Sequence, residues 1–233
     1  PERAENPSNF LESMLVARDS DGNPFPDEVI FGNAINMLMA GEDTTANTLT
    51  WTVHLLLEAP EAKSRLRKAV DDVLGDSPVV ESMEMAGELD GVGAVANETL
   101  RLKPPFPHST LTATEDTVVG DLKVEEGTTL LALHRMPACD PEYVDDPDDF
   151  DPSRWDDPKK LARLQRNGTY IPFGSGPRMC PGRSLALLQL RMVLSMLYKN
   201  FEVERVGDAD EVEEKFGLVM SPEGVTVKLR RRS

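Results

Sequence analysis

Residues Asp27 to Ala59 contain no proline and no closely spaced pair of glycines, so nothing in this stretch interrupts a single helix. Such a helix would span about 45–50 Å at 1.5 Å per residue. Apart from Glu42 and Asp43, no Asp, Glu, Lys or Arg occurs between residues 29 and 57. A helix that is apolar on most faces is predicted to be buried in the centre of a fold. A membrane span is not predicted, because polar residues leave no run of about 18 apolar residues.

Shorter helices and strands are predicted on both sides of this helix. Helical patterns occur at residues 9–17, 60–75, 91–102 and 181–199, with Pro60 and Pro181 at first helical positions. Alternating patterns predict strands at 109–113, 116–124, 127–134, 201–206 and 224–230. The acidic, proline-rich segment 140–157 is predicted to be irregular. The expected fold class is therefore mainly α with small β-sheets.

Composition excludes several classes of protein. The 233 residues are 39% hydrophobic, which is enough for a folded core. The formal net charge of −16 would repel phosphates and argues against a nucleic-acid-binding protein. Two cysteines, Cys139 and Cys180, are too few for a disulfide scaffold and indicate a reducing compartment. The first residues, PERAENPSNF, lack both the basic and the apolar region of a signal peptide.

The segment Phe173–Gly182, FGSGPRMCPG, carries the strongest chemical signal. Cys180 stands directly before a predicted helix, where backbone N–H groups and the helix dipole favour an anion. Glycines at 174 and 176 would let the backbone approach the sulfur, an arrangement that holds a thiolate as a metal ligand. Two alternatives stay open here. One is a buried cysteine in an ordinary turn, and the other is a phosphate loop, although Met179 breaks GxGxxG and no Walker lysine follows.

The pattern FxxGxRxCxG in this segment resembles the haem-binding loop of the cytochrome P450 family, the haem-thiolate monooxygenases. The resemblance implies that Cys180 is the proximal thiolate ligand of the iron of haem b and that Arg178 pairs with a haem propionate. It also assigns four further loop residues to cofactor binding: Phe173, Gly174, Gly176 and Gly182. The loop is most similar to soluble bacterial members, so a cytoplasmic location is expected, with the question of an upstream membrane anchor left open.

A second segment, Ala40–Thr45 with the sequence AGEDTT, lies in the middle of the predicted long helix. An acid beside a hydroxyl in an apolar helix is costly unless both have partners, and threonine can bond back to a carbonyl one turn earlier. A kinked core helix with back-bonded threonines is one interpretation. The family resemblance implies another, in which Asp43 and Thr44 relay protons to dioxygen, and Ala40 and Gly41 line the distal side of the haem.

A third motif is Glu98-x-x-Arg101, whose two residues share a helix face. By itself such a pair is commonplace and predicts little. In the family, this ExxR motif locks to an arginine in an FxPxR stretch, which here would be Arg154 in residues 150–154. The resemblance therefore implies a structural triad of Glu98, Arg101 and Arg154 that fixes geometry and takes no part in catalysis.

The region after this motif departs from the family pattern. An arginine often precedes the A-x-x-D stretch in the family, whereas Leu111 occupies that position here. His108, Arg135 or a residue of the lacking N-terminal half would then anchor a haem propionate, and His108 is added to the predicted cofactor-binding residues. The alternative is that His108 and His134 are turn or strand-end histidines without a ligand role.

The resemblance covers residues 1–233 and implies the C-terminal half of one catalytic domain, whose N-terminal half this sequence lacks. The implied enzyme uses O2 to oxidise an apolar organic substrate, with electrons from NAD(P)H through an acidic ferredoxin or a flavodoxin/reductase partner. Residues 154–200 carry nine Lys and Arg against two Asp, a net charge of +7 that would steer such a partner. The alternative is a non-catalytic haem-binding remnant or inactive fragment, because half a pocket cannot exclude water.

Overall fold

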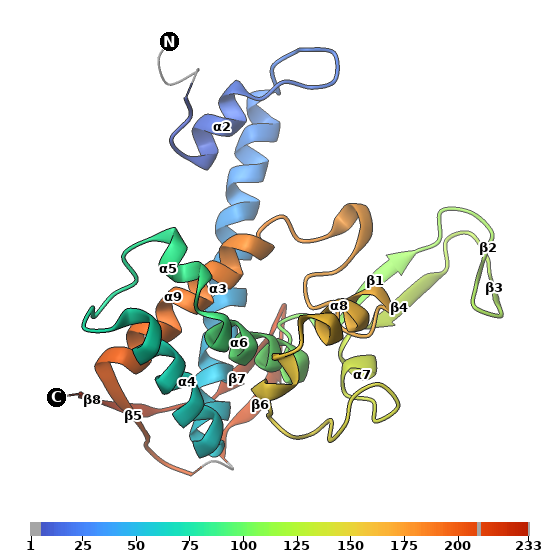
Figure 1. Ribbon diagram of the computed structural model, residues 1–233. Helices are drawn as coiled ribbons and strands as arrows, with labels where there is room; N and C mark the ends of the chain where they lie inside the picture. The colour runs from blue at the N-terminus through green and yellow to red at the C-terminus, as the bar shows by residue number, and fades with distance from the viewer. Residues whose placement is uncertain (1–5, 209–210, 233) are drawn as a thin grey trace. The chain divides into compact units, whose positions relative to one another are not determined.

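The computed structural model describes residues 6–208 and 211–232. It is mainly helical, and its described strands pair into two-stranded sheets, which confirms the predicted fold class (Figure 1). The chain divides into two compact units, Pro1–Thr44 and Thr45–Ser233. Both hydrophobic clusters of the described residues lie in the second unit.

The first helix among the described residues is α2 (Phe10–Val16), which confirms the helix predicted at residues 9–17. Asn9 caps this helix, because its side-chain oxygen accepts the backbone N–H of Glu12 at 2.9 Å. In the turn that follows, the carboxylate of Asp19 accepts the backbone N–H of Asn23 at 2.8 Å. Local side-chain hydrogen bonds therefore fix both the start of α2 and the turn before the long helix.

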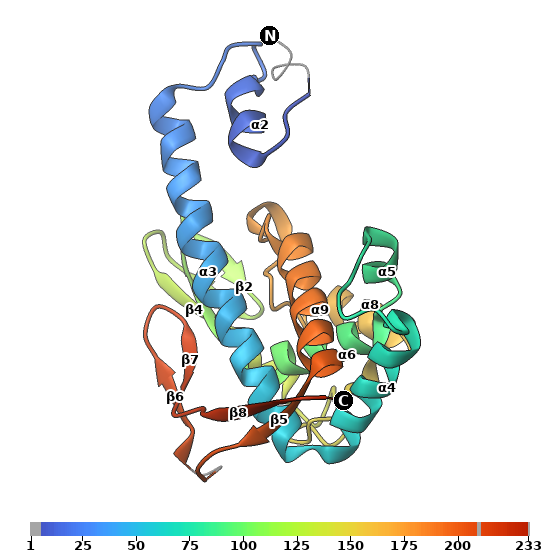
Figure 2. The ribbon, with the colours of Figure 1, turned by 90° about the vertical axis from the view of Figure 1, so that its left-hand side faces the viewer.

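The long helix α3 (Asp27–Glu58) is confirmed as one unbroken helix, and it crosses the boundary between the units (Figure 2). The prediction that it is buried is wrong for its first half, where Phe31, Leu38 and Met39 are 68%, 74% and 66% exposed. The sequence identifies apolar faces but not the neighbours that would cover them. Helix α2 cannot supply a core for them, because it has no buried residue of its own.

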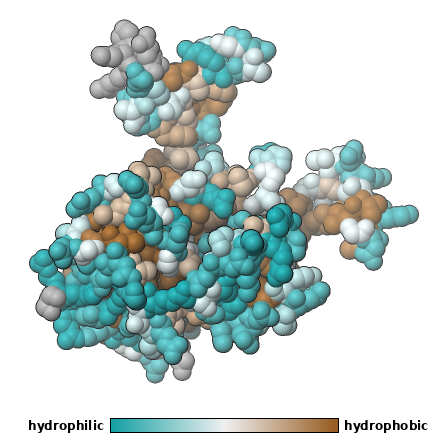
Figure 3. All heavy atoms as spheres, viewed as in Figure 1, coloured by the Kyte–Doolittle hydropathy of each residue, from teal (hydrophilic) through white to brown (hydrophobic). Residues whose placement is uncertain are grey.

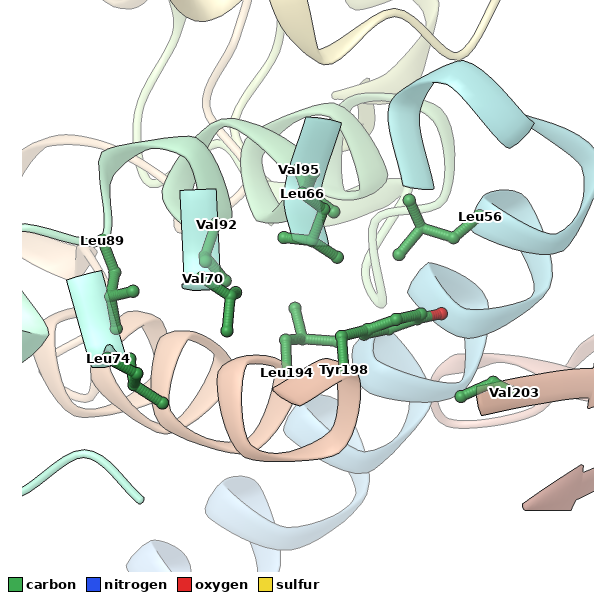
Figure 4. Packing of buried hydrophobic residues seen from close by; sticks show 10 residues of the cluster. All are labelled: Leu56, Leu66, Val70, Leu74, Leu89, Val92, Val95, Leu194, Tyr198 and Val203. Atoms are coloured by element: carbon green, nitrogen blue, oxygen red, sulfur yellow. The ribbon is translucent and has the colours of Figure 1, made fainter. Parts of the chain in front are cut away.

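The second half of α3 packs with three other helices around the main core. These are α4 (Pro60–Leu74), α6 (Asp90–Leu102) and α9 (Arg183–Asn200). Figure 4 shows the buried side chains of this core pointing toward one another: Leu56, Leu66, Val70, Leu74, Leu89, Val92, Val95, Leu194, Tyr198 and Val203. Helices α4 and α6 approach so closely that a Cβ added at Gly91 would lie 2.8 Å from the Cβ of Ala69.

The strands within residues 6–208 and 211–232 form four antiparallel pairs. These are β1 (His108–Thr112) with β4 (Thr129–Leu133), β2 (Thr117–Val119) with β3 (Leu122–Val124), β5 (Phe201–Arg205) with β8 (Val227–Arg231), and β6 (Glu213–Phe216) with β7 (Met220–Glu223). Figure 3 shows an apolar patch over the β2–β3 pair, where Val118 and Leu122 are exposed. The strands predicted from alternation are all present.

Several short elements were not predicted. They are α5 (Met83–Gly87), α7 (Arg135–Ala138), α8 (Pro158–Arg166), the β6–β7 pair, and the 3-10 helices η1 (Pro152–Trp155) and η2 (Gly176–Arg178). Most of these have five residues or fewer, too few to show a period in the sequence. The segment 140–157 is irregular as predicted, except for η1 near its end.

Candidate functional site

The most completely bonded polar cluster centres on Glu98 in α6, whose side chain is fully buried. Arg101 donates Nε–H to Glu98 Oε2 at 3.0 Å and Nη2–H to Oε1 at 2.8 Å. Arg154 of η1 donates its Nε–H to Oε1 at 2.8 Å. The structure thus brings together the three side chains of the predicted triad.

The remaining N–H groups of both arginines point to the last residue of α7 and to the backbone of the irregular segment that follows it. Their acceptors are the carbonyls of Ala138 (3.1 Å), Pro147 (2.6 Å) and Asp149 (3.0 Å) for Arg101, and of Asp145 (2.9 Å), Asp146 (3.2 Å) and Asp149 (3.4 Å) for Arg154. Residues 139–151 contain no helix or strand of their own. Two buried cations therefore supply the hydrogen bonds that shape this loop.

Two groups in this cluster were missed by the sequence reasoning. The indole N–H of Trp155 donates to Glu98 Oε2 at 2.9 Å, and the backbone N–H of Asp151 donates to Oε1 at 3.0 Å. Trp155 also packs against Tyr170 with ring centroids 4.8 Å apart, and burial raises the pKa of the Tyr170 hydroxyl above its usual value. Trp155 directly follows Arg154 in the sequence, and this adjacency is the signal from which its contact with Glu98 could have been predicted.

Cys180 lies in a loop that leads into α9. This helix begins at Arg183 with Gly182 as its N-cap, so the prediction that Pro181 is the first helical residue is wrong. The reason is a turn between loop and helix, in which the N–H of Arg183 donates to the carbonyl of Cys180 at 3.4 Å. The thiol is thus separated from the first turn of α9 by two residues.

The glycines at 174 and 176, which were predicted to let the backbone approach the sulfur, have a different role in the structure. Gly174 and Gly176 have φ angles of 73° and 66°, in the left-handed region that favours glycine, so they turn the backbone. The glycine beside the sulfur is Gly182, where an added Cβ would lie 3.7 Å from Cys180 Sγ. The Cys180 N–H donates to the Phe173 carbonyl at 2.9 Å and closes the loop.

The chemistry that this loop offers is a thiol beside a cation. Cys180 is a free, exposed cysteine. Arg178, two residues earlier, is also exposed, and no acidic side chain of the described residues pairs with it. A soft sulfur donor and an unpaired guanidinium together suit a metal centre whose surroundings carry anionic groups.

In the segment Ala40–Thr45, residues 40–44 belong to the first unit, whereas Thr45 and the other candidate residues belong to the second. Thr44 donates its hydroxyl to the carbonyl of Ala40 at 2.8 Å, which is the back-bond expected from the sequence. Ala40, Gly41 and Asp43 are exposed. A Cβ added at Gly41 would meet no atom within 4 Å apart from the adjacent residues and the local helix backbone. The face of α3 at Gly41 therefore has room for a ligand.

His108 begins β1 opposite Leu133, and its ring lies 5.0 Å from the ring of Phe216 between centroids. Leu111 is 54% exposed on the same strand. The guanidinium of Arg135, the other candidate for a propionate, donates to Glu214 at 3.0 Å and 3.3 Å. An anion would therefore have to compete with Glu214 for Arg135.

Comparison with known proteins identifies the family of this chain, which the geometry alone does not. The sequence model of the family described as Cytochrome P450 matches residues 1–229, almost the whole chain. The chain belongs to the cytochrome P450 family. Members of this family are oxidoreductases with a haem b cofactor held by a thiolate, and the mainly helical fold with small antiparallel sheets agrees with the family's fold.

Individual P450 relatives extend over nearly all of this chain. Cytochrome P450 4V2 from Rattus norvegicus is 32% identical over 228 residues, which are 96% of this chain and 42% of the relative. Cytochrome P450 27C1 from Danio rerio is 34% identical over 221 residues, 95% of this chain and 39% of the relative. Sterol 14alpha-demethylase from Mycolicibacterium vanbaalenii is 28% identical and shares 52% of its length with the chain. The chain thus spans about two-fifths to one-half of these P450 proteins.

The residues of the Cys180 loop fit the P450 cofactor. A P450 holds its haem iron through a cysteine thiolate, and Cys180 offers an exposed free thiol that could take this role. Haem also carries carboxylates, which the unpaired guanidinium of Arg178 can bind. None of the helices in the described ranges is both long and apolar enough to cross a bilayer.

Proposed function

We propose that this chain is the C-terminal part of a P450 catalytic domain that inserts one oxygen atom of O2 into an apolar organic substrate. The observation that carries the proposal is the exposed thiol of Cys180 in a loop turned by left-handed glycines. Haem, when bound, would supply the iron at which O2 is activated. Cys180 would hold the iron, and Arg178 would bind a propionate.

The proposed role of Asp43 and Thr44 is to deliver protons on the distal side. Thr44 donates its hydroxyl to a carbonyl of its own helix, 2.8 Å from Ala40 O, so the hydroxyl oxygen is held in a defined place and can accept a hydrogen bond from another donor. Asp43 is exposed to solvent. Together these side chains would connect solvent to the reacting dioxygen, while Ala40 and Gly41 leave space for it.

A Thr44→Ala variant of the haem-loaded enzyme tests this role. It should bind haem as before, but its NAD(P)H consumption should exceed product formation, with the difference released as hydrogen peroxide. Thr50→Ala is the matched control, because Thr50 makes the same kind of back-bond to Ala46 O at 2.9 Å on the same helix. If the ratio of product formed to NAD(P)H consumed is the same in both variants, the proposed proton delivery by Thr44 is contradicted.

The proposed electron donor is an acidic ferredoxin or a flavodoxin/reductase. The support is the +7 net charge of residues 154–200, in a chain whose total is −16. Lys159, Arg163 and Arg166 of α8 are exposed within this segment and are able to meet acidic groups of a partner. Such steering weakens with salt, so the rate of reduction should fall as ionic strength rises.

The triad would support this function structurally. Glu98, Arg101 and Arg154 shape the loop between α7 and η1, and none of them is exposed. We assign them no contact with substrate.

A non-catalytic haem-binding remnant is the second candidate. It is favoured by the exposed apolar side chains of α3, such as Leu38 and Met39, which are 74% and 66% exposed. Product formation from O2 and NAD(P)H in the presence of a redox partner distinguishes the two candidates. A remnant would bind haem and form no product under any of these conditions.

A further inference from the structure

A pocket of about 550 Å³ lies beside α7, and its described lining includes no residue of the 173–182 loop. Its walls come from the start of β1, the end of β4, α7 and the loop after α7. They are formed mainly by His108, Leu133, Met136 and Cys139, with Arg135 and Asp140 as the two charged residues. The pocket is open to solvent on one side, and its lining mixes apolar surface with a few polar groups, as the linings of small-molecule sites do.

Both charged residues of the pocket already have partners. Arg135 donates two N–H groups to the carboxylate of Glu214 in β6, at 3.0 Å and 3.3 Å. Lys103 forms a further ion pair with Glu214. Asp140 accepts the backbone N–H of Glu142 at 2.8 Å. The lining thus offers a ligand no unpaired cation among the described residues.

Glu214 is held in this position by the hairpin that carries it. The backbone N–H of Met220 in β7 donates to the carbonyl of Pro105 at 2.8 Å, and Met220 is buried. Phe216, two residues after Glu214 on the same face of β6, contacts His108 in the pocket wall. Lys103 Nζ lies 4.6 Å from the ring centroid of Trp51, so its position is also fixed.

The carboxylate remains charged at neutral pH. Burial alone would raise the pKa of Glu214, but the hydrogen bonds from Lys103 and Arg135 outweigh burial and hold the pKa below its usual value. A negative charge therefore lies beside the Arg135 guanidinium, although Glu214 is not itself one of the residues that line the pocket.

We propose that this pocket binds neutral, apolar small molecules and that Glu214 determines this specificity by occupying the guanidinium of Arg135. An anionic ligand would have to displace Glu214 from Arg135, which costs two charge-assisted hydrogen bonds. A neutral apolar ligand needs no such displacement and gains from burial against the apolar wall.

Two probes with the same ring system and different charge test the proposal on the purified full chain. They are 1-naphthylmethanol, which is neutral, and 1-naphthoate, which is an anion at neutral pH. The wild type should bind the alcohol at least about tenfold more tightly. In Glu214→Gln the affinity for naphthoate should rise about tenfold and fall again with salt, while the affinity for the alcohol stays within about twofold.

Glu213→Gln is the matched control, because Glu213 is the neighbouring exposed residue on the opposite face of β6. It should leave both affinities unchanged. Leu133→Trp should weaken both probes by filling the pocket. Unchanged naphthoate affinity in Glu214→Gln, or alcohol binding that survives Leu133→Trp, would overturn the proposal.

Hydrogen exchange of the Met220 amide checks that the hairpin stays docked in Glu214→Gln. If that amide loses protection, Glu214→Asp gives the second measurement, because its shorter carboxylate keeps the charge and weakens the contact. Its naphthoate affinity should lie between those of wild type and Glu214→Gln. A value equal to that of Glu214→Gln would contradict a role of the charge itself.

Discussion

At the scale of single residues, Glu98 is a buried charge that is held by several partners at once. Its carboxylate is fully buried and accepts five hydrogen bonds, from Arg101, Arg154, Trp155 and the backbone of Asp151. A buried charge is tolerated only when it is paired and fully hydrogen-bonded. Because the two arginines also bind loop carbonyls, Glu98 connects α6 to a loop that has no regular structure.

Glu98→Gln should therefore destabilise the protein strongly. The substitution keeps the shape but leaves two buried guanidinium groups without their anion, which costs about 3–5 kcal/mol. The control is Asp72→Asn, which breaks the exposed pair with Lys68 and should cost less than about 0.5 kcal/mol. Urea unfolding monitored by circular dichroism measures both values. Equal losses of unfolding free energy in the two variants would mean that the buried cluster stabilises the protein no more than an exposed ion pair does.

At the scale of elements, the contact between α4 and α6 depends on the absence of one side chain. A Cβ at Gly91 would lie 2.8 Å from Ala69 Cβ, which is closer than real carbon atoms approach. The close contact lets Leu66, Val70 and Val92 meet in the core shown in Figure 4. Helix propensity alone would favour alanine at position 91, so packing decides the residue.

Gly91→Ala should accordingly separate the two helices and cost about 1–3 kcal/mol of unfolding free energy. Gly87→Ala is the control, because Gly87 also lies in a helix and an added Cβ would meet nothing within 4 Å. That variant should be neutral or stabilised by up to about 1 kcal/mol. Thermal unfolding of both variants checks the prediction, and a stabilised Gly91→Ala would show that the contact is looser than described.

A second prediction at this scale concerns pH. Asp71 of α4 accepts hydrogen bonds from Lys199 at 2.9 Å and from Arg232, beyond β8, at 2.9 Å. Burial raises the pKa of Asp71, but these bonds outweigh it and hold the pKa below the ordinary value of 3.8. A carboxyl whose pKa is lowered in the folded state adds stability above its unfolded pKa and loses it as pH falls through the folded pKa.

Asp71→Asn should thus be less stable than wild type at pH 7. The difference between the two proteins should shrink below about pH 4, where the wild-type carboxyl begins to protonate in the unfolded state. Unfolding free energies at a series of pH values measure this difference. A gap that stays constant down to pH 2 would mean that the charge of Asp71 is not what holds the C-terminal end to α4.

At the scale of the whole molecule, the sequence predicted which segments form helices and strands better than it predicted which of their side chains are buried. The helix α3 follows from the absence of proline, but exposure of Leu38 and Met39 depends on what packs against them, and no pattern within the helix carries that information. The β6–β7 pair was missed because Glu213, Glu214 and Lys215 give it no apolar alternation. Tertiary contacts through Glu214 and Met220 stabilise it instead.

In the candidate site, too, some residues were predicted from the sequence and others were not. The Cys180 loop and the Glu98–Arg101 pair were found because their residues stand close together in sequence. The carbonyl acceptors of Arg101, from Ala138 to Asp149, could not be predicted, because backbone groups carry no sequence signal. The start of α9 at Arg183 was misplaced because a proline after a cysteine suits both a turn and a first helical turn.

The proposed function depends on Cys180 as the thiolate ligand of haem iron. The most direct test is the absorption spectrum of the reduced CO complex of the haem-loaded protein. Wild type and the matched control Cys139→Ser should both show the red-shifted Soret band of thiolate ligation, and Cys180→Ser should lack it. A Cys180→Ser variant that keeps this band, or a Cys139→Ser variant that loses it, would contradict this role of Cys180.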